Sequence, residues 1–223
     1  MAGLPSARFV AVVGVLSFWA GVFGAGLLVD AYSAREDYIS SLAGRGSPVA
    51  VVGVGALLAS AVAQLATSYA VFTRWRSRVC AFFLCGAGVA GATIASFRTS
   101  CPRGPAGCSR GEATTGDWID AVHASSVGAY ELFTLAAMLT LAIGAVRRGA
   151  PWPRWLGALS LVLAIGSVLL FGQTNGEDIG TWQRLWLADN LGWLLVVVLV
   201  ATTAGTVPRH RGSSGDRDVT TPG

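Results

Sequence analysis

The sequence predicts an all-α protein of the polytopic membrane class, a single bundle of six transmembrane helices. Of its 223 residues, 53% are hydrophobic and 13% are charged, and the mean hydropathy is +0.58. The apolar residues fall in blocks of membrane-spanning length rather than in short alternating runs. The charged residues lie almost entirely between these blocks. This distribution excludes an ordinary soluble domain.

The first three spans are expected at residues 9–29, 49–72 and 79–97. The first holds 21 residues, enough to cross a hydrocarbon core of roughly 30 Å at about 1.5 Å per residue. Its apolar run is too long for a secretory signal and no clear cleavage site follows, so we expect it to remain uncleaved. A polar segment follows, and its charged residues are most simply interpreted as solvated side chains of a loop. The third span is rich in small residues, which suits close helix packing in lipid.

The last three spans are expected at residues 118–146, 155–171 and 185–206. A polar segment with Pro and Gly spaced through it precedes the fourth span, and two prolines mark the turn before the fifth. The membrane domain therefore covers residues 1–206. The remaining residues, 207–223, are short of apolar side chains and are predicted to form a disordered tail.

The placement of the arginines predicts the orientation. All 16 basic residues are Arg. Ten lie on the side of the chain ends and six on the other side, so the positive-inside rule puts both termini in the cytoplasm and three polar loops outside. Because the arginines flank apolar blocks instead of forming one patch, nucleic acid is not an expected partner. The absence of Lys, with abundant Ala, Gly and Val, is typical of high-GC actinobacteria and suggests a bacterial plasma membrane.

Two cysteines lie in the predicted outer loop between the third and fourth spans. Cys101 and Cys108 are separated by six residues, and in an oxidising exterior they predict a loop-closing disulfide. A zinc site is less favoured, because usual zinc-ligand spacings are about two to four residues. Cys80 and Cys85, in the third span, are expected to be small packing residues.

The fourth span carries a polar face. At about 100° per residue, five side chains fall within about a third of the helix circumference: Asp120, His123, Tyr130, Glu131 and Thr134. Asp120 also suits the helix dipole at the first turn, which is a purely structural role. Glu131 lies near the middle of the bilayer, where an ionised carboxylate costs at least about 2.5–3.5 kcal/mol. Such a residue faces the bundle interior, is paired or is protonated. It marks a candidate site, with a structural hydrogen bond to a neighbouring helix as the alternative.

His123 can titrate, donate a hydrogen bond or ligate a metal. An interfacial position without chemistry is the simpler interpretation. A metal centre at Asp120 and His123 would need further ligands. The available carboxylates are Glu36, Asp37 and Asp189, and nothing in the sequence brings them together. We therefore expect no metal and no other cofactor.

The sixth span has a second mixed face, formed by Gln183, Trp186, Asn190 and Trp193, with Asp189 beside it. Trp186 is adequately explained as an anchor in the interfacial aromatic belt. Trp193 lies deeper, which favours an aromatic-lined polar pocket. Arg184, at the outer end of this span, is the expected partner for an outward carboxylate or an anionic headgroup.

Four stretches carry a resemblance to a known family: DYISSLAGRGSP after the first span, FRTSCPRGPAGC after the third, TTGDWIDAVH at the start of the fourth and WQR before the sixth. In these residues the chain resembles the bacterial Domain of Unknown Function 998 membrane proteins, over roughly residues 9–206. The resemblance implies six spans with outward polar loops and brings no established activity. The motif positions that it carries over are Ile39, Ser40, Leu42, Cys101, Cys108, His123 and Arg184.

The leading functional hypothesis is an outward-opening polar pocket that binds a lipid headgroup or a small amphiphile. Membrane lipids are then the expected partners. One wall is formed by Asp120, His123, Tyr130 and Glu131, the opposite wall by Asp189, Asn190 and Trp193, and the rim by Arg184.

Two alternatives remain open. The first is a membrane-embedded enzyme of hydrolase or cyclase type acting on a lipid or isoprenoid, with Glu131 or Asp189 as general acid and His123 as base or metal ligand. No complete catalytic motif supports it. The second is a small proton-coupled transporter with Glu131 as proton carrier, which the lack of a recognisable repeat or broken helix disfavours.

Overall fold

The computed structural model describes residues 6–30, 32–100, 118–147, 150–175 and 178–203. Throughout these residues the fold is helical and contains no strand. The long helices are α1 (Ala7–Leu27), α3 (Ala50–Ala70), α4 (Arg78–Ser96), α5 (Trp118–Val146), α6 (Arg154–Gln173) and α7 (Ile179–Thr203). A π-helical turn, η1 (Val71–Trp75), extends α3, and α2 (Ile39–Leu42) is a single turn. Six of these helices are long and apolar enough to cross a membrane, which confirms the predicted all-α six-span class.

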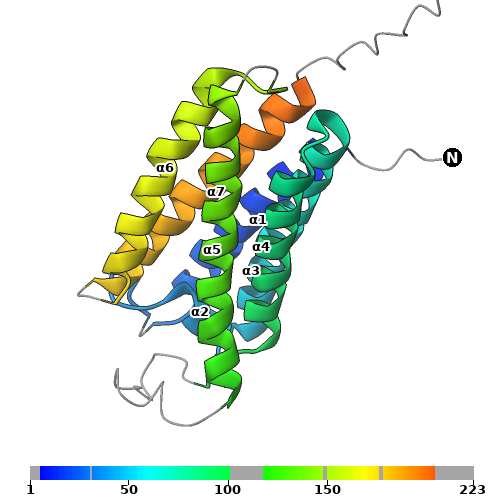
Figure 1. The fold of residues 1–223 in the computed structure, drawn as a ribbon. Coiled ribbons are helices and arrows are strands. Elements are labelled where there is room, and N and C mark those ends of the chain that lie inside the picture. The colour runs from blue at the N-terminus through cyan, green and yellow to red at the C-terminus, as the bar shows by residue number, and fades with distance from the viewer. Residues whose placement is uncertain (1–5, 31, 101–117, 148–149, 176–177, 204–223) are drawn as a thin grey trace, which may run out of the picture.

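The long helices pack in chain order around a ring, α1 on α3, α3 on α4, α4 on α5, α5 on α6 and α6 on α7. Contacts of α7 with α1 close the ring, and α7 also touches α3 across it. The start of α1 and the end of α7 lie at one end of the bundle, and α2 lies at the other (Figure 1). We call these the terminal end and the α2 end. Small residues allow close helix contact, since a Cβ at Gly14 would lie 2.6 Å from the carbonyl oxygen of Ala59.

The bundle is apolar outside and partly polar inside, the reverse of a soluble protein. Large apolar side chains are exposed around its circumference, among them Phe9, Leu16, Phe82, Val162 and Leu169. Buried polar side chains point inward, among them Gln64, Thr67, Glu131, Thr134, Ser160, Ser167 and Asn190. This arrangement fits a hydrocarbon environment, in which polar groups must find partners within the protein.

The α2 end contains more structure than the spans alone predict. The sixth long helix begins at Ile179, before the expected start of the span at residue 185, and the polar side chains of its first turns are bound by the segment between α1 and α3. In that segment Arg35 and Glu36 are exposed, as expected for solvated charges, whereas Asp37 is buried. The segment is nevertheless folded. It contains α2, and the side chains of Ile39 and Leu42 are only 3% and 2% exposed. The other predicted spans agree with the helices to within a few residues.

The α2 segment (residues 32–49) is held onto the helix ends by hydrogen bonds from several elements. Arg98, just after α4, donates from Nε to Ala43 O at 2.8 Å and from Nη2 to Gly44 O at 2.9 Å. The hydroxyl of Tyr38 donates to the carbonyl oxygen of Thr174, at the end of α6, at 3.0 Å. The α2 segment is therefore bonded to the ends of α4 and α6.

Several sequence expectations lie outside the described residues or away from any site. Cys101, Cys108 and the tail at 207–223 are outside the described residues. Cys80 is buried and Cys85 is exposed, and both are free thiols. The buried position of Cys80 agrees with a packing role, whereas Cys85 faces the surroundings of the bundle.

Candidate functional site

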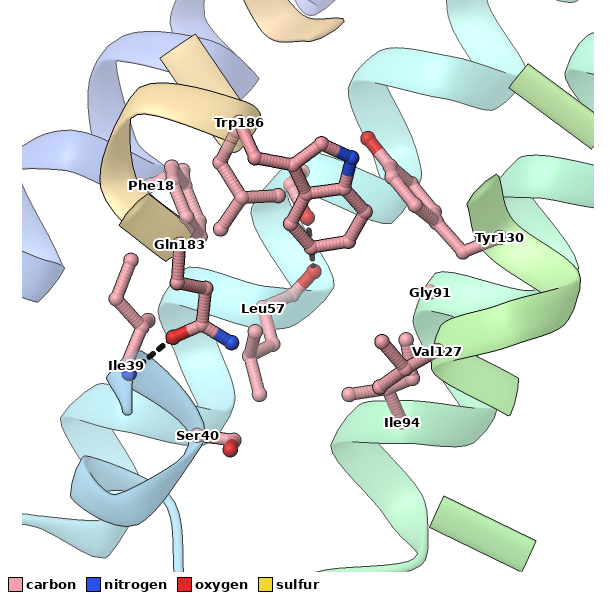
Figure 2. Close-up of a pocket in the computed structure, with 12 residues that line it drawn as sticks. Phe18, Ile39, Ser40, Leu57, Gly91, Ile94, Val127, Tyr130, Gln183 and Trp186 are labelled. Carbon is pink, nitrogen blue, oxygen red and sulfur yellow. Dashed lines mark hydrogen bonds between the residues drawn. The ribbon is translucent and has the colours of Figure 1, made fainter. Parts of the chain in front are cut away.

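An internal cavity, partly open to the surroundings, lies within the ring of helices next to α2 (Figure 2). The space open to the centre of a water-sized sphere is about 40 Å³, where one water molecule needs about 10–15 Å³. The cavity is therefore narrow, with room for a few waters or for part of a hydrocarbon chain. Its walls come from α1, α2, α3, α4, α5 and α7 and comprise Phe18, Ile39, Ser40, Leu57, Ser60, Gly91, Ile94, Val127, Tyr130, Gln183, Trp186 and Leu187.

Polar groups stand at both ends of this mostly apolar cavity. Next to α2, the side-chain oxygen of Gln183 accepts a hydrogen bond from the backbone N–H of Ile39 at 2.6 Å. Figure 2 shows the amide nitrogen of Gln183 turned toward the cavity. At the deep end, the rings of Tyr130 and Trp186 meet edge to face, with centroids 5.8 Å apart. Trp186 is only 2% exposed, so the expectation that it anchors the chain in the interfacial belt is wrong.

Behind Trp186 lies a cluster of polar side chains around Glu131, which is 3% exposed. The indole N–H of Trp186 donates to Oε2 of Glu131 at 2.8 Å, and the hydroxyl of Ser167 lies 2.9 Å from Oε1. The amide nitrogen of Asn190 lies 3.4 Å from Oε2. The carboxyl group thus joins α5 to α6 and α7, in the part of the bundle where water does not compete.

The hydroxyl of Ser167 has more than one acceptor within reach in this cluster. The oxygen of Ser167 lies within 3.1 Å of both carboxyl oxygens of Glu131 and 3.0 Å from the side-chain oxygen of Asn190. A serine hydroxyl carries one hydrogen and can serve only one of these acceptors well. The hydroxyl of Ser167 and the side-chain amide of Asn190 thus join Glu131 in one hydrogen-bonded network that connects α5, α6 and α7.

A second carboxyl group lies beside this cluster. Asp189 is half-buried on α7, and its Oδ2 is shielded without a hydrogen-bond partner among the described residues. A Cβ at Gly166 of α6 would lie 3.3 Å from its Oδ1. Asp189 directly precedes Asn190, whose amide nitrogen lies 3.4 Å from Oε2 of Glu131. The structure therefore brings together the two acidic residues that the sequence singled out within the spans.

The polar residues at the start of α5 lie elsewhere. Nδ1 of His123 is 2.8 Å from the carbonyl oxygen of Phe97, at the end of α4. Asp120 accepts hydrogen bonds from the backbone N–H of Ser100, at 2.7 Å, and from its hydroxyl. Both side chains fasten the start of α5 to the end of α4, and neither lines the cavity. No group of three His, Cys, Asp or Glu side chains within the described ranges is arranged as a metal site would need.

Arg184 binds the α2 segment. Its Nη1 donates to Ala34 O at 2.6 Å and to Gly180 O at 2.8 Å, and its Nη2 donates to the hydroxyl of Tyr32. The guanidinium also lies over the Tyr32 ring, 5.5 Å from its centroid. Burial raises the pKa of Tyr32, and the positive charge of Arg184 opposes that shift. The guanidinium is therefore engaged by protein groups at the α2 end.

Trp193 is fully buried away from the cavity, where its indole N–H donates to the hydroxyl of Ser160 at 2.9 Å.

Sequence reasoning missed Ser167 and Gln64. Gln64 is 0% exposed, and its amide nitrogen donates to the hydroxyl of Tyr130 at 3.0 Å. Its Oε1 has no partner among the described residues. A lone amide within the second span was the signal that could have identified it, because such a group must find a partner inside the bundle.

The fold and the buried polar cluster define the class of the protein, a multi-pass membrane protein with a polar interior. The family described as "Protein of unknown function (DUF998)" matches residues 12–200. The chain belongs to this family, which confirms the resemblance of its motifs. The matched range contains the cavity, the carboxyl cluster and the α2 segment. No curated protein and no solved structure matches the chain.

Proposed function

We propose that this protein binds a membrane amphiphile, with part of the ligand's hydrocarbon chain inside the cavity and its polar part near α2. The observation that carries this proposal is a partly open cavity among membrane-spanning helices, with apolar walls and hydrogen-bonding groups at its two ends. Ligand sites usually combine apolar lining with a few polar groups that fix orientation. The narrow volume favours one chain over a whole headgroup.

Within this proposal the polar residues have different roles. Tyr130 and Gln183 contact the ligand, at the deep end and next to α2. Glu131, Ser167 and Asn190 hold the Trp186 wall in position through the indole N–H. Asp120, His123 and Arg184 keep the connections between helices in place, and Trp193 packs away from the ligand.

The proposed orientation follows the arginine distribution. The terminal end carries more arginines and faces the cytoplasm, so that the α2 end faces outward from a bacterial plasma membrane. The cavity next to α2 then lies at the level of the outer leaflet. The ligand is accordingly proposed to come from that leaflet or from the exterior.

The test compares two leucine substitutions at glycines of different surroundings. Gly91 lines the cavity, and a Cβ there would be 3.4 Å from the Cβ of Ala61, so Gly91→Leu extends into the open space. Gly192 is exposed and has nothing within 4 Å of such a Cβ. Gly192→Leu is therefore the matched control.

The wild-type protein and both variants are reconstituted in lipid nanodiscs and analysed by native mass spectrometry with lipid extraction. A retained amphiphile is expected in the wild type and in Gly192→Leu, with at least a tenfold loss in Gly91→Leu. Equal retention in all three, or no retention in any, contradicts the proposal.

A further inference from the structure

A second hollow lies on the outside of the bundle, between α4 and α5. Its volume is about 410 Å³, larger than that of the internal cavity. Apolar and small side chains form its walls, among them Phe82, Val89 and Phe133. Because α4 and α5 cross the membrane, this groove faces lipid chains rather than water.

The groove and the internal cavity lie back to back on the same two helices. On α4, Ala90 lines the groove and the next residue, Gly91, lines the cavity. On α5, Ala129 lines the groove and Tyr130 lines the cavity. What separates the two spaces is the contact between these residues, which we call the α4–α5 contact. Its side chains are small except for the Tyr130 ring, which approaches the Cβ position of Gly91 to 4.0 Å.

The hydrogen bonds between α4 and α5 lie away from this contact. Toward the α2 end, His123 meets the carbonyl oxygen of Phe97, and toward the terminal end the thiol of Cys80 meets Ala137 O at 3.9 Å. Among the described residues of the α4–α5 contact, no side chain is hydrogen-bonded across to the other helix. The hydroxyl of Ser126, beside the groove, bonds within its own helix. The two helices are therefore joined at both ends and held between them by van der Waals contact alone.

The alternative way into the cavity runs past α2, where the described residues are held by hydrogen bonds. Gln183 holds the start of α2, Arg98 holds its end, and Arg184 holds the chain before it. Opening this end breaks the hydrogen bonds of two arginines, each worth about 1.5–3 kcal/mol, and that of Gln183. Separating apolar side chains in lipid breaks no hydrogen bond, and acyl chains replace the van der Waals contacts that are lost.

We propose that the cavity is loaded sideways from the membrane, between α4 and α5, by the linear acyl chain of a membrane lipid. This inference rests on the proposed amphiphile binding and adds the ligand class and its route. The acyl chain first binds in the groove. The Tyr130 ring and the residues around Gly91 then move apart, and the chain enters the cavity. Near the inner end, the chain meets Tyr130, whose hydroxyl already accepts from Gln64.

The experiment uses the full chain in nanodiscs with a phospholipid that carries a photoactivatable diazirine in the middle of one acyl chain. After irradiation, the adducts are mapped by mass spectrometry. Adducts are expected on the groove residues Val89 and Phe133 and on the cavity residues Leu57 and Val127. Adducts in the groove without any in the cavity would overturn both this inference and the proposed binding function.

A matched pair of variants isolates the route. Ala129→Leu narrows the α4–α5 contact, whereas Ala124→Leu places the same side chain on an exposed position of the same helix. Ala129→Leu is expected to reduce cavity adducts at least fivefold while groove adducts persist, and Ala124→Leu to change neither. Ala129→Val replaces it if the leucine variant does not fold. Undiminished cavity adducts in Ala129→Leu would overturn the lateral route without contradicting the proposed binding function.

A third variant tests the other entrance. Arg98→Ala removes two hydrogen bonds from the end of α2 without touching the cavity. The rate of cavity labelling is expected to stay within twofold of the wild-type rate. A labelling rate several-fold faster would show loading through the α2 end and overturn the lateral route.

Discussion

The indole of Trp186 lines the internal cavity with its ring and donates its N–H to Oε2 of Glu131 at 2.8 Å. One side chain thus belongs both to the cavity wall and to the buried carboxyl cluster. A change in that cluster must therefore alter the wall, because the ring position depends on the hydrogen bond. This relationship connects the acidic residue in the membrane interior with the proposed ligand.

The first prediction concerns that hydrogen bond. Trp186→Phe retains an aromatic wall and removes the shortest hydrogen bond to Oε2 of Glu131, a loss of about 1–3 kcal/mol. We expect a lower unfolding temperature and weaker ligand retention. Differential scanning fluorimetry and native mass spectrometry measure both. Trp155→Phe, at a 54% exposed position, is the control and should change neither.

The second prediction concerns the hydrogen bonds of the Glu131 side chain. Glu131→Gln supplies an amide whose oxygen can accept from Trp186 and whose nitrogen can donate to Ser167. We expect its thermal stability to remain close to that of the wild type. Glu131→Ala removes the acceptor of the Trp186 indole and of the Asn190 amide, and it should destabilise the protein by about 1–3 kcal/mol for each unsatisfied group. Equal losses in both variants would show that an amide cannot replace the carboxyl group in these hydrogen bonds.

Hydropathy and arginine placement were enough to predict the six-span fold, because a bilayer imposes span length and polarity on any crossing helix. The start of α7 was not predictable in this way. Gln183 and Arg184 are too polar for a span, and they are tolerated only because the α2 segment bonds to them. A solvated loop and a folded α2 segment have similar composition, and the burial of Ile39 and Leu42 depends on contacts distant in sequence.

The candidate site could be predicted only in part. Glu131 stood out because a carboxyl group within an apolar span is energetically costly. Its partners could not be deduced, since helical periodicity gives the face of each helix but not the rotation of α5 relative to α6 and α7. Ser167 carries no signal within its span. Asp120 and His123 share a face with Glu131 but lie more than a turn away, where they bond the end of α4.

The third prediction concerns pH and the exposed pair Arg35–Asp178, whose atoms Nε and Oδ1 are 2.6 Å apart. The hydrogen bond from Arg35 lowers the pKa of Asp178 below its ordinary value of 3.8. A carboxyl group with a depressed folded-state pKa contributes stability that is present above 3.8 and is lost as the pH falls through the lower, folded value. We expect a small loss of thermal stability below about pH 4, weakened by added salt.

Asp178→Asn is a clean test of that pair, because residue 178 has a φ of 54° and asparagine tolerates the left-handed region well. In the variant, the part of the stability loss at low pH that depends on salt should disappear, and the rest should remain. Unfolding temperatures of the wild type and the variant, measured from pH 6 to pH 3 at low and high salt, test this expectation. An unchanged salt-sensitive response in the variant would assign it to other groups.

The fourth prediction concerns the close approach of the α2 segment to α7. A Cβ at Gly180 would lie 2.6 Å from the carbonyl oxygen of Ala34 and 2.9 Å from Nη1 of Arg184, so Gly180→Ala pushes the segment away and weakens the Arg184 bonds. We expect a loss of stability of about 1–3 kcal/mol, typical of overpacking. Gly172→Ala, where nothing lies within 4 Å, should instead be neutral or slightly stabilising, because alanine is favoured over glycine in helices. Thermal unfolding compares the two, and limited proteolysis within residues 32–49 should accelerate only in Gly180→Ala. Equal proteolysis in both variants would show that the α2 segment does not depend on this contact.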